Sequence, residues 1–176
     1  MNDVIVGNVC SLCAMVSDSV SGTRKKQNQI LAVQIISQVF YGAGSIILKG
    51  YSSTAQNVVA VLRNLAAIKK IKYKVVEWAL VALGVGLGVW FNNRGLVGWL
   101  PIVANLEYSL AVFGFKESER WLKIAFIVNA ALYSVFNVII SNYVGAAANA
   151  VVIIMTGISL IKGAKKKEET EKNEAE

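Results

Sequence analysis

Seven apolar stretches alternate with short polar segments along the chain. A helix of about 20 apolar residues crosses the hydrocarbon layer of a bilayer, and most of the stretches come close to that length. The third stretch is the shortest. The pattern predicts an all-α integral membrane protein with seven transmembrane helices, which cover residues 3–20, 29–49, 54–68, 75–92, 97–115, 121–140 and 144–162.

Composition agrees with this pattern. Hydrophobic residues make up 55% of the 176 residues and charged residues only 16%, which leaves no room for a soluble catalytic domain. Five of the 18 basic and five of the 11 acidic residues fall in residues 162–176. A segment this polar, without aromatic residues, cannot bury enough surface to fold alone. We therefore expect residues 163–176 to form a charged, solvated cytoplasmic tail.

Basic residues collect in alternate connections between the stretches. Cytoplasmic loops accumulate Lys and Arg during membrane insertion, so this bias predicts an N-terminus outside and a C-terminus in the cytoplasm. Lys49 and Arg94 fall on the other side, and Arg63 lies inside a stretch. The remaining 15 basic residues share the predicted cytoplasmic side: Arg24, Lys25, Lys26, Lys69, Lys70, Lys72, Lys74, Lys116, Arg120, Lys123, Lys162, Lys165, Lys166, Lys167 and Lys172.

Missing residue types exclude several functions. The chain has no His, so imidazole cannot bind a metal or act as acid or base. Cys10 and Cys13 form a CxxC pair inside an apolar stretch, which favours a packing role. Neither a GxxxxGK[ST] loop nor a nucleophile with its base is present, so we expect no enzyme and no cofactor. The basic residues do not interleave with aromatic ones, which argues against a nucleic-acid partner.

An internal repeat appears when the chain is shifted by 92 residues. Residues 29–70 then align with residues 121–162, and eight of 42 positions are identical. The spacing Tyr-x9-Tyr-x5-Asn recurs in both halves, where it places Tyr41, Tyr51 and Asn57 opposite Tyr133, Tyr143 and Asn149.

The repeat predicts a division into three spans, one linker span and three more spans. The first triple-helix bundle would cover residues 1–70, the linker transmembrane helix residues 71–94 and the second bundle residues 95–162. Because three is odd, the single linker makes the two bundles parallel, related by an axis along the membrane normal. Gly84 and Gly88 give the linker the GxxxG spacing that permits close approach of a neighbour.

Polar residues inside the stretches form matched faces. Ser37, Tyr41 and Ser45 recur every four residues and share one face of a helix, and Asn57 and Asn64 share another. The repeat places polar residues at the equivalent positions of the second half, which are Asn129, Tyr133, Asn137, Asn149 and Thr156.

Two interpretations fit these faces. Ser, Thr and Asn commonly hold membrane helices together through interhelical hydrogen bonds that contribute about 0.6 kcal/mol and at most about 1.7 kcal/mol each. Alternatively the faces line a cavity near the repeat axis, which the recurrence of the Tyr and Asn pairs favours. On this interpretation a substrate would contact Tyr41, Asn57, Tyr133, Asn149, Asn64, Ser37 and Asn129.

Two charges break the repeat. Arg63 aligns with Met155, and Glu107 aligns with Met15. A charge in the hydrocarbon layer needs a partner or water, so one hypothesis pairs Arg63 with Glu107 across the two halves or places both along the path. The alternative for Arg63 is snorkelling, because it lies only a few residues from the cytoplasmic end of its span.

The chain resembles the SWEET, SemiSWEET and PnuC group of transporters over residues 3–162. In that group an Asn on the third helix of each bundle contacts substrate and an earlier aromatic residue packs over it. Asn57 with Tyr41, and Asn149 with Tyr133, match those positions. The Pro-Gln pair of related hinges is absent, and the one proline is Pro101.

A second resemblance comes from a shorter run. Residues 51–57, Tyr-Ser-Ser-Thr-Ala-Gln-Asn, followed by Leu-Arg-Asn-Leu at residues 62–65, are similar to the YgjV-type bacterial inner membrane proteins. This resemblance implies a location in the bacterial inner membrane. It implies no particular substrate.

The sequence therefore favours a facilitator that moves a small, polar, largely uncharged metabolite, such as a sugar, nucleoside or vitamin, by alternating access. Asn amides offer donors and acceptors to hydroxyl groups, and Tyr rings can stack on a sugar or base. The expected partners are this solute, the lipid bilayer and a second copy in a homo-oligomer. The alternative is a non-transporting scaffold or accessory subunit whose charged tail contacts a cytoplasmic partner.

Overall fold

The computed structural model describes residues 2–22, 27–69, 71, 73–114 and 119–175. Within this part the chain forms seven α-helices, one short 3-10 helix η1 (Gly95–Gly98) and no strand, which confirms the all-helical prediction. The helices are α1 (Asn2–Gly22), α2 (Gln27–Ile47), α3 (Tyr51–Ile68), α4 (Lys74–Trp90), α5 (Trp99–Gly114), α6 (Glu119–Ile139) and α7 (Tyr143–Ala175).

Length and apolar composition vary among these helices. The part of α7 from Tyr143 to Lys162 is long and apolar enough to cross a membrane by itself, and shorter apolar segments cover Asn2–Ser17, Ala32–Ile47 and Lys123–Ile139. Seven membrane crossings therefore stay a prediction. Six of the basic residues that predict orientation lie outside the described residues: Arg24, Lys25, Lys26, Lys70, Lys72 and Lys116.

The turns after α2 and α6 have the same geometry. Two residues after each helix ends, the chain adopts the left-handed conformation, at Lys49 with φ 58° and at Ser141 with φ 63°. In the first turn the Gly50 N–H donates to the Ser45 carbonyl at 2.7 Å, and in the second the Asn142 N–H donates to the Asn137 carbonyl at 2.8 Å. Many helices end with this hydrogen bond between residues five positions apart, because it gives a partner to a carbonyl of the last turn.

The equivalent positions of the two turns are 92 residues apart, and the helix boundaries keep the same offset. Helix α6 covers the residues that correspond to α2, and α7 begins at the equivalent of the first residue of α3. Gly22 and Gly114, the last residues of α1 and α5, are also 92 residues apart. The local structure thus repeats at the offset that the sequence predicts.

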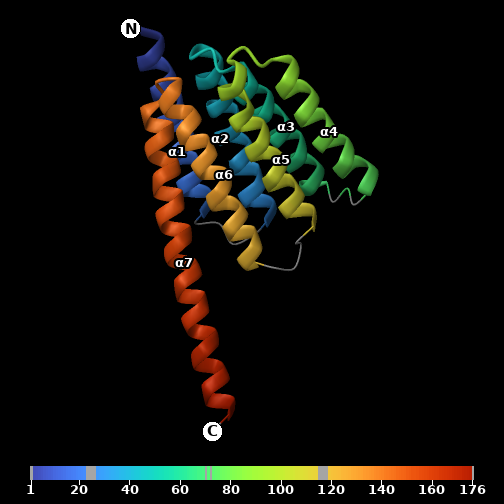
Figure 1. Ribbon diagram of the computed structural model, residues 1–176, viewed down its shortest axis with the longest axis vertical. Helices are drawn as coiled ribbons and strands as arrows, with labels where there is room; N and C mark the ends of the chain where they lie inside the picture. Colours follow the sequence, from blue (N-terminus) through green and yellow to red (C-terminus); the bar gives the residue numbers. More distant parts are fainter. Residues whose placement is uncertain (1, 23–26, 70, 72, 115–118, 176) are drawn as a thin grey trace.

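Six helices close into a ring. Along the ring α1 contacts α2, α2 contacts α3, α3 contacts α5, α5 contacts α6, α6 contacts α7, and α7 returns to α1. Exchanging α1, α2 and α3 with α5, α6 and α7 leaves this order unchanged, so the contacts have twofold symmetry. Helix α4 lies outside the ring against α3 and α5 (Figure 1).

Small residues allow α4 to dock closely. Gly84 and Gly88 are buried, as the GxxxG spacing predicts, and the Gln56 side-chain amide donates to the Gly84 carbonyl at 2.8 Å. A Cβ atom at Gly88 would lie only 2.6 Å from Ile102 Cγ1 and would also meet the Gln56 amide. Position 86 faces open space.

Helix α7 continues past the apolar segment. It ends at Ala175, and its C-terminal part projects beyond the other helices (Figure 1). Lys, Glu and Ala are favourable helix residues, and a helix that has already started adds residues more easily than a new one nucleates. The charged tail of residues 163–176 is therefore an extension of α7 through Ala175 and not a separately folded unit.

Docking of α4 provides a stability test. We expect Gly88→Ala to lower the free energy of unfolding by about 1–3 kcal/mol, because the added methyl group displaces Ile102 and the Gln56 amide. The control Gly86→Ala should be neutral or raise it by up to about 1 kcal/mol, since its methyl group meets nothing. Thermal or denaturant unfolding in detergent measures both, and equal stabilities would contradict the tight contact.

Candidate functional site

A cavity of about 360 Å³ lies between α2, α3, α5, α6 and α7. Sixteen of its nineteen lining residues carry polar side chains, and the exceptions are Ala60, Phe126 and Val152. A cavity of this size suits one small organic molecule. It is therefore the main candidate site in the described part of the chain.

Repeat-related residues face each other in this cavity. Tyr41 and Tyr133 both line it, and so do Asn57 and Asn149. Both halves of the predicted repeat therefore contribute matched residues to the cavity wall. Of the other residues predicted to contact substrate, Asn64 and Asn129 also line the cavity, whereas Ser37 does not.

The side between α3 and α5 has no counterpart across the axis. Gln56, Arg63, Asn105 and Tyr108 lie there. Asn105 Nδ2 donates to Gln56 Oε1 at 2.6 Å, and Arg63 Nη1 donates to Asn105 Oδ1 at 3.3 Å. Sequence reasoning missed Gln56, Asn105 and Tyr108. The signal was available for the two amides, because a polar side chain inside an apolar stretch needs a partner or a function.

The predicted contact between Arg63 and Glu107 is not formed. Arg63 Nη1 also donates to Ser109 Oγ at 3.2 Å, and its guanidinium carbon lies 5.4 Å from the centre of the Tyr108 ring. Ser109 and Asn105 are four residues apart and share a face of α5, whereas Glu107 is two residues from each and faces elsewhere. Arg63 therefore lies in the cavity wall, and Glu107 does not line the cavity.

Several of the polar residues hold helices together. Asn129 Nδ2 on α6 donates to the Ala104 carbonyl of α5 at 2.8 Å, and the Ser45 and Ser53 hydroxyls bond each other at 3.1 Å between α2 and α3. Ser37 is fully buried and donates to the Gln34 carbonyl within its own helix at 2.9 Å. Asn129, Ser45 and Ser53 therefore join helices, and Ser37 bonds within its own helix, as the packing interpretation predicts.

Other lining residues have no such role. Among the described residues, nothing hydrogen-bonds to the side-chain amides of Asn57, Asn64 and Asn149 or to the hydroxyl of Tyr133. Their polar atoms are not sealed from the cavity either, because the fully buried atoms without partners in the described part belong to Ser11, Ser52 and Glu107. These amides and this hydroxyl are free to bind a solute in the cavity.

An apolar cluster lies about one helical turn beyond the lining residues Ser45 and Asn137, at what we call the closed end of the cavity. Leu48, Phe136 and Ile140 are buried against one another, and Val97 and Leu100 pack on them. Leu48 and Ile140 are repeat equivalents, so both halves contribute to the cluster. At the opposite end, Gln34 and Gln38 are only half-buried.

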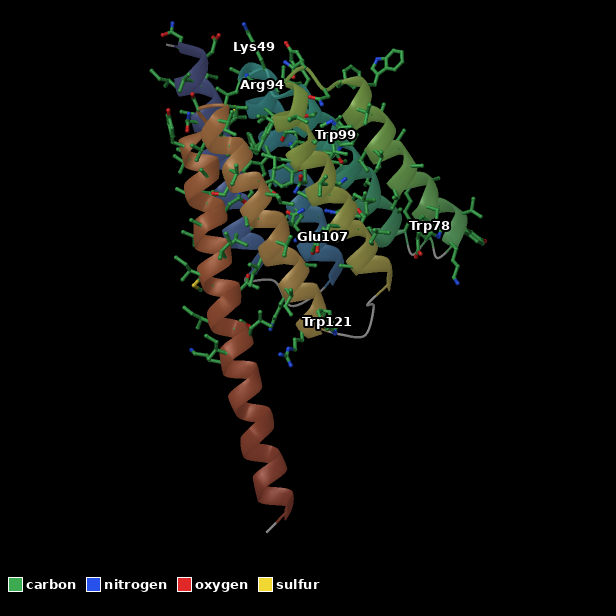
Figure 2. All side chains as sticks on the ribbon, viewed as in Figure 1. Lys49, Trp78, Arg94, Trp99, Glu107 and Trp121 are labelled. Carbon is green, nitrogen blue, oxygen red and sulfur yellow. The ribbon has the colours of Figure 1, made fainter. Side chains whose placement is uncertain are left out.

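At the closed end, side chains from α1 and from the end of the linker hydrogen-bond to the turns after α6 and α2. Asn8 of α1 donates to the Ser141 carbonyl at 3.0 Å and accepts from the Val144 N–H at 2.8 Å. Arg94, just before η1, donates to the carbonyls of Leu48 at 2.9 Å and Lys49 at 3.2 Å. Lys49 and Arg94, the two basic residues that depart from the predicted bias, lie together at this end (Figure 2).

The cavity offers binding groups and no reactive constellation. In the described part of the chain no three His, Cys, Asp or Glu side chains gather to hold a metal ion. Cys10 and Cys13 are free thiols that do not line the cavity. Amides, hydroxyls and one guanidinium can recognise a polar solute, but they do not form a nucleophile with its base.

Comparison with known proteins identifies the family. The model of the Imp-YgjV family, described as a bacterial inner membrane protein, matches residues 5–167, and the chain therefore belongs to this family. Its location is the bacterial inner membrane. No curated protein and no solved structure matches the chain.

Two asparagines of the cavity wall test which polar side chains hold helices together and which do not. We expect Asn129→Ala to lower the free energy of unfolding by about 0.6–1.7 kcal/mol, because it removes a hydrogen bond between α6 and α5. Asn149→Ala removes no hydrogen bond to protein and should change stability by less than about 0.5 kcal/mol. Unfolding of the two variants in detergent is the measurement, and a larger loss for Asn149→Ala would contradict the assignment.

Proposed function

We propose that this member of the Imp-YgjV family is a membrane carrier that moves a small polar metabolite by alternating access. The observation that carries the proposal is a central polar cavity whose Asn57 and Asn149 amides have no hydrogen bond to the described part of the chain. Amides used only for packing would be bonded to neighbouring helices. Two matched amides and two Tyr rings around one axis are suited to the hydroxyl groups and ring faces of a solute.

The outer surface supports insertion of all seven helices. Large apolar side chains are exposed along all seven helices, and contact of so many of them with water would be unfavourable. Tryptophans are exposed near the helix ends, with Trp99 at the end that holds Arg94 and Trp78 and Trp121 at the other (Figure 2). Tryptophan favours the boundary between lipid and water at both membrane faces.

The division into two triple-helix bundles and a linker is part of this proposal, as is the likeness to SWEET and PnuC carriers. Twofold order in the ring and the position of α4 outside it support that division. Alternating access would follow from rocking one half against the other. The end closed by Leu48, Phe136 and Ile140 would then be one gate of the carrier, shut in this conformation.

Orientation follows from the same division. We place the N-terminus and the closed end outside and the C-terminus of α7 in the cytoplasm, since the connections rich in Lys and Arg share the C-terminal side. The closed end holds Lys49 and Arg94, and the Arg94 guanidinium donates to the backbone carbonyls of the α2–α3 turn. The chain would then open toward the cytoplasm.

A scaffold or accessory subunit is the second candidate. The observation in its favour is the charged extension of α7, which projects beyond the ring and offers a helix to a cytoplasmic partner (Figure 1). On either proposal the chain is not an enzyme and binds no nucleic acid, and its partners are the bilayer and, for the carrier, a small solute. A homo-oligomer fits both proposals.

Fusion reporters test the orientation. We expect green fluorescent protein fused after Glu176 to fluoresce in a bacterial host, because it folds in the cytoplasm, and alkaline phosphatase fused there to be inactive. The same pair fused after Asn93, between α4 and α5, should give the opposite result. Fluorescence at both sites, or at Asn93 alone, would contradict the proposed topology.

Ligand binding and flux test the carrier. Purified protein screened against sugars, nucleosides and vitamins should gain thermal stability with its solute, by about 2.7 kcal/mol at a ligand concentration one hundred times Kd. Liposomes containing the protein should take up the same solute. We expect the Asn57→Ala/Asn149→Ala double variant to fold and to lose both signals.

Asn2→Ala is the matched control, because it removes an exposed amide that lies outside the cavity. It should keep binding and uptake. Absence of any shift and of any uptake across the panel, with a double variant that is merely less stable than the parent, would overturn the carrier proposal and favour the scaffold.

A further inference from the structure

The cavity wall contains one charged side chain. Arg63 lies on the side between α3 and α5, and none of the nineteen lining residues is an Asp or Glu. In the described part of the chain no carboxylate reaches Arg63, which bonds Asn105 and Ser109 instead. The polar space at the centre of the ring therefore has a net positive charge.

The contacts of Arg63 orient its head group without neutralising it. Asn105 and Ser109 are neutral acceptors, and both bind Nη1. A guanidinium has five N–H donors, so Nη2 and Nε keep three that no described side chain uses. A charge enclosed by low-dielectric surroundings is costly unless it has an opposite charge or water nearby.

A chain of amides holds this head group in place. Gln56 Nε2 donates to the Gly84 carbonyl on α4, which turns Gln56 Oε1 toward Asn105. Asn105 Nδ2 donates to that oxygen, which turns Asn105 Oδ1 toward Arg63. Each amide thus fixes the orientation of the next. The outer helix α4 supports the arginine through this chain, although α4 does not line the cavity.

We propose that the solute carries an anionic group, a carboxylate or a phosphate, which binds the free edge of the Arg63 guanidinium. This inference rests on the carrier function proposed above and names the class of its solute. Planar guanidinium donors match the paired oxygens of both anions. The neutral part of the solute then lies between Asn57 and Asn149 at the repeat axis.

The repeat makes this binding directional. The position equivalent to Arg63 is Met155, which offers no charge, so the anion has one place in the cavity and the solute one orientation. The sequence alone favours a largely uncharged metabolite, because Asn amides and Tyr rings suit hydroxyl groups and the faces of sugars or bases. The position of Arg63 in the cavity wall changes that expectation.

Matched solute pairs test the charge preference on the parent protein. Isothermal titration in detergent compares lactate with lactamide and glucose 6-phosphate with glucose, and extends to further carboxylates and sugar phosphates with their neutral counterparts. We expect at least one anion to bind about ten- to a hundredfold more tightly than its neutral counterpart, the range given by a charge-assisted pair. Which pair responds distinguishes carboxylate from phosphate.

Three variants attribute the preference to Arg63. Arg63→Met, which installs the residue of the other half, should abolish it, and Arg63→Lys should keep part of it because the charge remains. Lys69→Met removes an equal charge from an exposed position outside the cavity and should leave it unchanged. If Arg63→Met does not fold, the parent pairs and Arg63→Lys still decide the question.

The outcomes separate this inference from the carrier proposal. Equal binding of anions and neutral counterparts by the parent, with neutral binding lost in Asn57→Ala/Asn149→Ala, would overturn the inference and leave the carrier standing. An anion preference that survives Arg63→Met would also overturn it. If no solute of either kind binds or is taken up by liposomes, both proposals fail.

Discussion

Polar side chains enclosed by apolar helices need hydrogen-bond partners. In this protein that requirement determines how the helices of the ring pack and which side chains face the cavity. Gln56 is the clearest example. It is buried on α3, donates to the backbone of α4 at Gly84 and accepts from Asn105 on α5, so three helices share one side chain. Since leaving either end of a buried amide unpaired is unfavourable, the positions of the three helices depend on one another. The same hydrogen bonds position Arg63, because the Asn105 amide that donates to Gln56 also accepts from the Arg63 guanidinium.

The helices follow a twofold symmetric order, but the side chains that line the cavity do not. The two turns, the helix boundaries and the order of the ring repeat at one offset, whereas the side chain that hydrogen-bonds to the turn is Asn8 in one case and Arg94 in the other. The charge in the cavity also belongs to one half. In the proposed carrier, the two halves would move against each other and the unmatched residues would give the solute a preferred orientation.

The structure distinguishes polar residues that look alike in the sequence by whether their side chains are hydrogen-bonded. Ser37, Asn129, Asn57 and Asn149 all appear as polar positions on inward faces, yet the first two are engaged by carbonyl groups and the other two are not. Spacing along a helix predicts a shared face but not the distance to the next helix. Whether an amide binds a neighbour or a solute depends on that distance.

The sequence alone determined the number and approximate position of the helices, their turns and the offset of the repeat, because hydropathy and helix termination act over a few residues. It also predicted that Tyr41 and Asn57 belong to one polar site, and both residues line the cavity. Only the tertiary structure decided that α4 lies outside the ring and that Arg63 bonds Asn105 instead of Glu107. The Arg63–Asn105 bond joins residues 42 positions apart, and both contacts depend on how each helix is rotated and packed, which no local pattern records.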